Sequence, residues 1–422
     1  MPRKPKSSSR FASLRAKSPF YWVKLVVWFG LVGYVAWLSF IHAVANITWQ
    51  QNPDVALRFV PNHPLALSRK ADELFSQSQS PATLKKVEAM AKESLRGGAL
   101  NPVAIRLLGY VAEVRGDRKK ARELMLLSQK VSRRDFGTQL WLIEDAVERG
   151  DKKQALYHYN IALRTTPRSF DLLIPTLIGA LDDPEVRSGL VPYVKEAADW
   201  LPTFLNQAIS TATDPKNVAD VLMRSGRLPD RPEYTAISNQ LLSVLAAKSK
   251  FFVFQRYYLS LAGAQKQALY TAGLNRSTVN IAYPPAGWQV TDSAVIGGSF
   301  SAFDKSGAAQ LSAFAQSGER GELMRKYLFL ESGNYEFSAN YQAESDTSDA
   351  EIRWEMQCLS ASANISKWIN TTSVKQGPSA AAQAFSLGSE CKYQLLTLQL
   401  AGGSNQLGME FTLRSVSIKR RS

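Results

Sequence analysis

Three patterns of apolar and polar residues follow one another along the chain. The first is an apolar run, Leu25–Ala45, of twenty-one residues without a charged side chain. A bilayer core of about 30 Å needs roughly 20 apolar residues at helical rise, and only a helix satisfies the backbone there. Helical periodicity follows over 46–278, and period-two alternation over 288–422. We therefore expect a multi-domain chain: a transmembrane helix, an all-α region and an all-β antiparallel sandwich.

The residues before the apolar run favour a cytoplasmic N-terminus. Residues 1–24 carry seven Lys or Arg and no acid, and such charges stay on the cytoplasmic side of a span. A single-pass protein of a bacterial inner membrane, with its bulk in the periplasm, is the expected topology. The alternative is a cleaved signal peptide, because Ala43-Val44-Ala45 resembles a cleavage site. The length of the apolar run and of the basic leader favours retention, and both alternatives export the residues after about 46.

The net charge of +15 does not indicate a nucleic-acid partner once its distribution is considered. Residues 1–24 carry +7, residues 46–285 carry 32 basic and 23 acidic side chains, and residues 286–422 carry 12 and 13. Nearly half of the excess positive charge therefore lies in the N-terminal tail, where it reflects membrane topology. The moderately basic middle region suits an anionic glycan, lipid headgroups or an acidic protein.

The chain has two cysteines, Cys358 and Cys391. In an oxidising compartment, two cysteines on strands of one small domain favour a disulfide. The alternative is that each is a separate buried thiol.

A repeat is present in the helical region. A shift of thirty-four residues places Gly116-Asp117 on Gly150-Asp151. The same shift aligns five further pairs: Leu108 with Leu142, Ala112 with Ala146, Ala121 with Ala155, Met125 with Tyr159, and Ser128 with Ala162. This pattern resembles the tetratricopeptide repeat, whose period is 34. The resemblance implies a solenoid of helical hairpins over 46–278, clearest in 102–168, that binds a protein partner.

About seven short strands are expected after a linker at 279–287. They are Ile296–Phe303, Ala309–Phe314, Leu323–Leu330, Tyr335–Tyr341, Ile352–Cys358, Leu395–Leu400 and Met409–Ile418. The order of Trp288, Arg325–Leu328, Leu330–Tyr335, Trp354–Cys358 and Cys391–Gln394 resembles the jelly-roll sandwich of carbohydrate-binding modules. That resemblance implies a domain over 288–422 that binds glycan.

Catalytic chemistry finds little support in the sequence. The three histidines, His42, His63 and His158, have no spaced set of metal ligands beside them, so we expect no metal and no cofactor. The sandwich contains no histidine for a Ser/His/Asp or Cys/His arrangement. The loops Gly297-Gly298 and Gly402-Gly403 lack the lysine and helix of a phosphate cradle. Four strand carboxylates, Glu336, Glu351, Glu355 and Glu410, leave open a lyase or glycosidase, although solvated strand faces explain them more simply.

Two surfaces are candidates for binding. The first is a basic cluster that would bind a protein partner or an anion: Arg115, Arg118, Lys119, Lys120 and Arg122. The alternative there is an ordinary solvated helix face. The second would bind glycan: Trp368 as an exposed aromatic, with Arg353, Glu355 and Gln357 on one polar strand face. The alternatives are a tryptophan tucked onto the sandwich edge and a half-exposed strand.

The order of anchor, repeats and sandwich resembles inner-membrane tetratricopeptide proteins of bacterial envelope polysaccharide pathways. The resemblance implies a non-catalytic scaffold in cell-envelope or exopolysaccharide assembly or export. The rivals are a carbohydrate-active enzyme with its site in the sandwich, and a purely structural sandwich that caps the solenoid.

Overall fold

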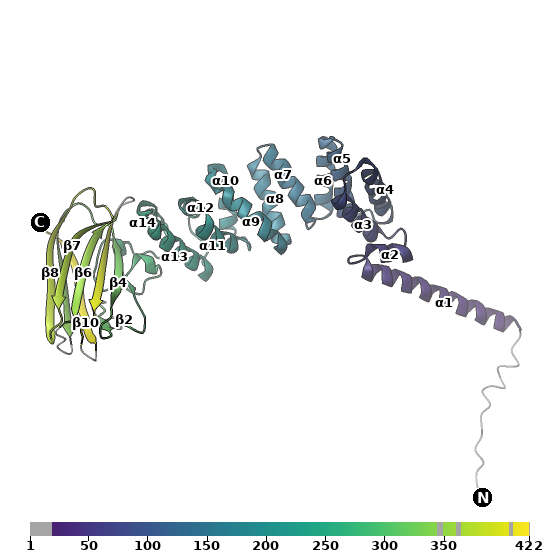
Figure 1. Ribbon diagram of the computed structural model, residues 1–422. Helices are drawn as coiled ribbons and strands as arrows, with labels where there is room; N and C mark the ends of the chain where they lie inside the picture. Colours follow the sequence, from purple (N-terminus) through teal and green to yellow (C-terminus); the bar gives the residue numbers. More distant parts are fainter. Residues whose placement is uncertain (1–18, 344–348, 360–363, 405–407, 422) are drawn as a thin grey trace, which may run out of the picture. The chain divides into compact units, whose positions relative to one another are not determined.

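The computed structural model describes residues 19–343, 349–359, 364–404 and 408–421 (Figure 1). The chain divides into two compact units, one ending at Phe170 and one beginning at Asp171. This division lies within the segment 46–278 that we expected to be one helical domain. Most of the basic N-terminal tail, residues 1–18, lies outside the described residues.

Helix α1 (Pro19–Thr48) contains the expected apolar run. It is the one helix among the described residues that is long and apolar enough to cross a membrane. Its C-terminal end is packed against the rest of the first unit, because Ala45 is buried together with Ala56 and Ala66. Asn46 Oδ1 also lies 3.1 Å from His63 Nε2, so a side-chain contact joins α1 to the next helices.

The remainder of the first unit is helical. Its α-helices are α2 (Pro53–Phe59), α3 (Pro64–Gln77), α4 (Pro81–Gly97), α5 (Pro102–Val114), α6 (Arg118–Val131), α7 (Phe136–Glu148) and α8 (Lys152–Thr165), followed by a 3-10 turn, η1 (Pro167–Ser169). Helix α3 packs with α4, α5 with α6, and α7 with α8. The sequence sets these helix starts locally, because α2 to α5 each begin with proline and α2 to α8 each have a side-chain N-cap.

The thirty-four-residue spacing is repeated in the backbone. Gly116 and Gly150 both have positive φ, 81° and 71°, which glycine adopts without strain. Asp117 and Asp151 then cap α6 and α8. Each aspartate also donates its backbone N–H to the carbonyl five residues earlier, at 3.0 and 2.8 Å. The two helix pairs are therefore closed by the same turn.

The second unit begins with helices and ends with strands. Its helices are α9 (Phe170–Gly179), η2 (Ala180–Asp182), α10 (Pro184–Lys195), α11 (Leu201–Thr211), α12 (Lys216–Ser225), α13 (Pro232–Ala247), α14 (Phe251–Ser260), η3 (Lys266–Leu269) and η4 (Pro284–Ala286). Aromatic rings join α14 to the strands: Phe251 lies against Tyr327 and Tyr393, and Phe254 against Phe329. These contacts place α14 in one compact unit with the sandwich.

The strands form two five-stranded antiparallel sheets, which confirms the expected sandwich. They are β1 (Gln289–Val290), β2 (Ile296–Phe300), β3 (Leu311–Ala315), β4 (Arg320–Leu328), β5 (Gly333–Ala343), β6 (Glu351–Cys358), β7 (Ile365–Ser373), β8 (Gly377–Leu387), β9 (Gln394–Ala401) and β10 (Met409–Arg420). One sheet has the order β1-β4-β9-β6-β7, and the other β2-β3-β10-β5-β8. Aromatic side chains meet between them, with Phe337 against Trp354 and Trp368.

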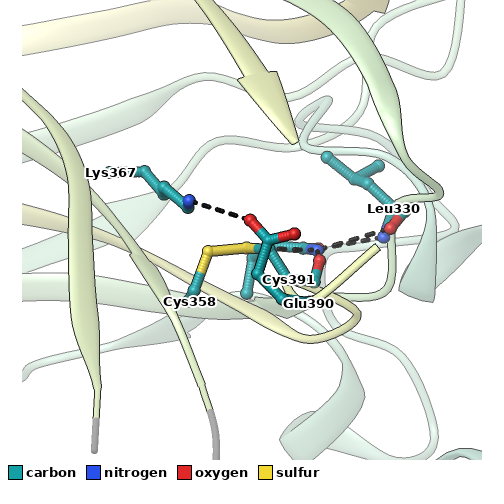
Figure 2. The surroundings of a disulfide bond; sticks show 6 residues. Leu330, Cys358, Lys367, Glu390 and Cys391 are labelled. Atoms are coloured by element: carbon teal, nitrogen blue, oxygen red, sulfur yellow. Dashed lines mark hydrogen bonds and ion pairs between the residues drawn. A yellow bond between two sulfur atoms is a disulfide. The ribbon is translucent and has the colours of Figure 1, made fainter. Parts of the chain in front are cut away.

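Cys358 and Cys391 form the predicted disulfide. Their Cα atoms lie 5.2 Å apart across a sequence separation of 33 residues. Figure 2 shows the bridge, with the ion pair between Lys367 and Glu390 beside it. The loop that the bridge closes contains both β7 and β8.

The segment 279–287, expected to be a linker, is packed against the sandwich. Pro285 and Ala286 are buried in η4. The Lys326 side chain on β4 donates from Nζ to the Ala286 carbonyl at 3.0 Å. Trp288, directly after the segment, donates from Nε1 to the Ala272 carbonyl at 3.2 Å, so the C-terminal end of the segment is held in place.

Candidate functional site

A groove of about 530 Å³ lies on the outward face of the sheet that contains β2, β3 and β10. The strand register builds its floor from two rows of residues. Gly297, Phe314 and Glu410 form one row, and Ser299, Ser312 and Thr412 form the next. Asp292 pairs with Gly297 through a backbone bridge and also lines the groove.

Phe314 lines this groove from the middle strand, β3, where it pairs with Gly297 on one side and Glu410 on the other. It is half-buried, on a strand whose flanking residues Ala313 and Ala315 face the core. A side chain at Gly297 would meet the ring, since a Cβ there would lie 2.9 Å from Phe314 Cε1. Glycine at this position therefore lets an aromatic ring lie flat across the neighbouring strand.

Carboxylates and hydroxyls surround the ring. Asp292, Glu410 and Ser312 are exposed, so their oxygens are available to a ligand. An aromatic surface combined with several hydrogen-bonding groups is the arrangement that binds polar ring-shaped ligands. The groove therefore suits a ligand with an apolar face and many hydroxyls.

Sequence reasoning missed this groove. The expected strand Ile296–Phe303 contains Gly297-Gly298, but no ligand-binding role was assigned to it, and the structure places the pair within the edge strand β2. The signal that was present is the alternation of Ala313, Phe314 and Ala315, which sends one large ring to the outward face between two small core residues.

The predicted polar strand face is brought together on the other sheet. Gln357 Nε2 donates to Glu355 Oε1 at 3.0 Å, and Arg353 lies 3.8 Å from the same carboxylate. The Glu355 side chain is only 10% exposed. Its row continues through Thr397 to Arg325. The three residues form an internal network in which the carboxylate is already occupied.

Trp368 is not the exposed aromatic residue that we expected. It is 7% exposed, lies on β7, and packs against Phe337 and Phe385 in the core. The segment is absent from the expected strands because Trp368 is the one buried residue of β7, while the apolar Ile365 and Ile369 are exposed. Its ring therefore offers no open face to a glycan.

The basic cluster is largely neutralised within the first unit. Arg115 pairs with Glu88 at 2.7 Å, while Arg118 and Arg122 lie 3.6 and 2.6 Å from Asp145. Lys119 and Lys120 are exposed. The structure thus leaves the two lysines at the surface and uses the three arginines in ion pairs.

Asp145 is the centre of that arrangement. It is 1% exposed and also receives Arg149 at 3.1 Å. Burial alone would raise the pKa of Asp145, but hydrogen bonds from Arg122 and Arg149 outweigh it and hold the pKa below its usual value. The arginines therefore stabilise a buried carboxylate.

The described residues contain no group of three or more His, Cys, Asp or Glu side chains that could hold a metal ion. Two histidines have structural contacts. His63 Nδ1 accepts the Ala66 N–H as the N-cap of α3. His158 is hydrogen-bonded to Gln139 at 3.0 Å, and burial lowers the pKa of His158 to about 4.

No protein-family model matches the chain, and no curated protein matches it. Solved structures that are similar to the C-terminal β region include carbohydrate-binding modules. TmCBM61, solved with β-1,4-galactotriose, has 12% identity and a TM-score of 0.23, over 32% of this chain and 88% of its own. A CBM4 structure has 9% identity and a TM-score of 0.25, over 37% and 98%. The CBM22-1 xylan-binding domain of Paenibacillus barcinonensis Xyn10C has 11% identity and a TM-score of 0.25, over 36% and 93%.

Proposed function

We propose that this protein is a membrane-anchored glycan-binding protein whose sandwich holds polysaccharide in the groove of β2, β3 and β10. The observation that carries the proposal is the half-exposed Phe314 ring between Asp292 and Glu410. The ring supplies an apolar surface for the C–H face of a sugar. The carboxylates and the hydroxyls of the adjacent row accept hydrogen bonds from sugar hydroxyls.

The spacing of the carboxylates favours binding over hydrolysis. Asp292 and Glu410 are three strand spacings apart, about 14 Å between backbones. Glu351 and Glu355 lie four residues apart on β6, about 13 Å. The paired carboxyl groups of most glycosidases are separated by about 5–10 Å. We therefore propose a non-catalytic role, with a lyase or glycosidase as the alternative.

The other parts of the chain extend the proposal. Helix α1 anchors the protein in a bacterial inner membrane with the bulk in the periplasm, a compartment in which the disulfide persists. The repeated turns at Gly116 and Gly150 support a tetratricopeptide-like stack that holds a protein partner. Together these roles define a scaffold in cell-envelope or exopolysaccharide assembly.

Binding of the full chain in detergent to an array of bacterial polysaccharides tests the glycan site. Phe314→Ala and Glu410→Gln should each reduce retention about five- to thirtyfold, since each removes a contact worth about 1–2 kcal/mol. Glu336→Gln is the matched control, because Glu336 is exposed on the same sheet but outside the groove. Retention unchanged in both groove variants, or no binding by the wild type, would refute the proposal.

The alternative function has its own test. Release of reducing ends or unsaturated products from a bound polysaccharide, lost in Glu410→Gln or Glu355→Gln, would establish an enzyme and overturn the non-catalytic role.

A further inference from the structure

A second, more enclosed cavity is lined by residues of α12, α13 and α14 and of the loops beside them, in the helical part of the second unit. Three tyrosines line it, Tyr234, Tyr257 and Tyr283, together with Ser238. Its volume is about 180 Å³, which is smaller than the roughly 300–1,000 Å³ of pockets for drug-sized ligands. A single ring with its substituents is the largest ligand that such a cavity encloses.

The hydroxyl hydrogens of two tyrosines are already used. Ser238 donates its only hydroxyl hydrogen to the Tyr234 carbonyl at 2.8 Å. Tyr257, 2.9 Å from Ser238 Oγ, must therefore donate to that oxygen. Tyr283 donates to the Ala262 carbonyl at 3.0 Å. Both phenol oxygens consequently remain available as acceptors.

Tyr234 is different from its neighbours. It is 2% exposed, and its hydroxyl is buried without a hydrogen-bond partner among the described residues. A buried polar group without a partner costs free energy, and native proteins rarely retain one without a reason. Burial raises the pKa of Tyr234, so the hydroxyl keeps its proton and remains both a donor and an acceptor.

The rim of the cavity carries one charge of each sign. Arg227 and Asp230 are exposed and both line it. A rim with one charge of each sign gives no net preference for an anion or a cation, while each charged group can hydrogen-bond a hydroxyl. The interior thus offers several acceptors and one free donor, and the rim completes a neutral, hydrogen-bonding site.

We propose that this cavity binds one neutral sugar ring, whose hydroxyls donate to Tyr257 and Tyr283 and exchange a hydrogen bond with Tyr234. Leu228 and Leu261 form the apolar part of the wall and contact the C–H surface of the ring. The site is separate from the groove on the sandwich and goes beyond the function proposed for that groove. The cavity recognises a monosaccharide or the terminal sugar of a chain, because a cavity of this size cannot enclose a longer saccharide.

Thermal unfolding of the full chain in detergent, with a panel of monosaccharides, tests the proposal. Glucose, galactose, mannose and N-acetylglucosamine are the neutral probes, and galacturonate and glucosamine are the charged ones. At least one neutral sugar should raise the unfolding temperature of the wild type. Tyr234→Phe should weaken the binding of that sugar about tenfold or more, and it should leave polysaccharide retention by the groove unchanged.

Tyr270→Phe is the matched control, since Tyr270 belongs to the same unit but does not line the cavity. The proposal is overturned if no monosaccharide shifts the unfolding temperature, if Tyr234→Phe binds as tightly as the wild type, or if a charged probe binds more tightly than every neutral sugar. Loss of groove binding in Phe314→Ala with the monosaccharide effect intact would support two independent sites.

Discussion

Replacing Lys326 by Met should change how the stability of the second unit depends on pH. Lys326 is fully buried, and its ammonium group donates one hydrogen bond, to the Ala286 carbonyl. The Trp288 ring centroid lies 5.9 Å from Nζ. Burial lowers the pKa of Lys326 from 10.5 to about 7, because the charged form is poorly solvated there.

The sign of the effect follows from this lowering. Between pH 7 and 10.5 the unfolded state binds more protons than the folded state, so the free energy of unfolding increases with pH. The cost of the buried charge is fully present below pH 7 and is relieved as the pH approaches 10.5. The difference between 10.5 and about 7, at about 1.4 kcal/mol for each pKa unit, corresponds to about 5 kcal/mol in total.

Urea unfolding of the full chain in detergent, followed by tryptophan fluorescence and near-UV circular dichroism, measures this slope. Between pH 7 and 9.5 the wild type should gain about 3 kcal/mol relative to Lys326→Met. The Met variant also leaves the Ala286 carbonyl without its donor, but that cost of about 1–3 kcal/mol is independent of pH.

Lys419→Met is the control, because Lys419 is exposed on β10 and its loss should leave the pH dependence of the wild type unchanged. Parallel pH profiles for the wild type and Lys326→Met would refute the reasoning, since they would show that the lysine keeps its ordinary pKa in the folded protein.

Three further changes test other parts of the chain. Cys358→Ser should destabilise the sandwich by about 3–4 kcal/mol, the entropy of a loop of about 33 residues, measured as a lower denaturation midpoint; an unchanged midpoint argues against the bridge. Asp145→Asn should cost about 2–3 kcal/mol, because it removes the buried carboxylate that three arginines share; calorimetry that shows no loss in the first unit contradicts this. Gly150→Ala should cost about 1–2 kcal/mol at its positive φ, whereas Gly179→Ala, at φ −59°, should be neutral or stabilising.

Features with a local signal could be predicted from the sequence. The apolar run, the caps at Asp117 and Asp151 and the alternation of β4 all depend on residues close together in the chain. In the alternation of β4, Lys326 shares a face with Met324, and both side chains are fully buried. The unusual burial of that lysine was therefore implicit in the pattern.

Features that depend on tertiary packing could not be predicted. Strand β8 was missed because its central residues are mostly alanine, which has little preference for strands. The burial of Trp368 could not be read from the sequence because its partners, Phe337 on β5 and Phe385 on β8, belong to the opposite sheet. The groove around Phe314 depends on the register of three strands, and no single segment carries that information.

The junction between α1 and the first hairpin has a mechanical consequence. The helix does not end in a loose tether, because Ala45 is buried against Ala56 and Ala66, and Asn46 contacts His63. A helix joined in this way transmits torque: if α1 tilts or rotates in a bilayer, the attached helices turn with it. Lipid thickness and the packing of α1 against other membrane helices would then set the direction in which the hairpins of the first unit face.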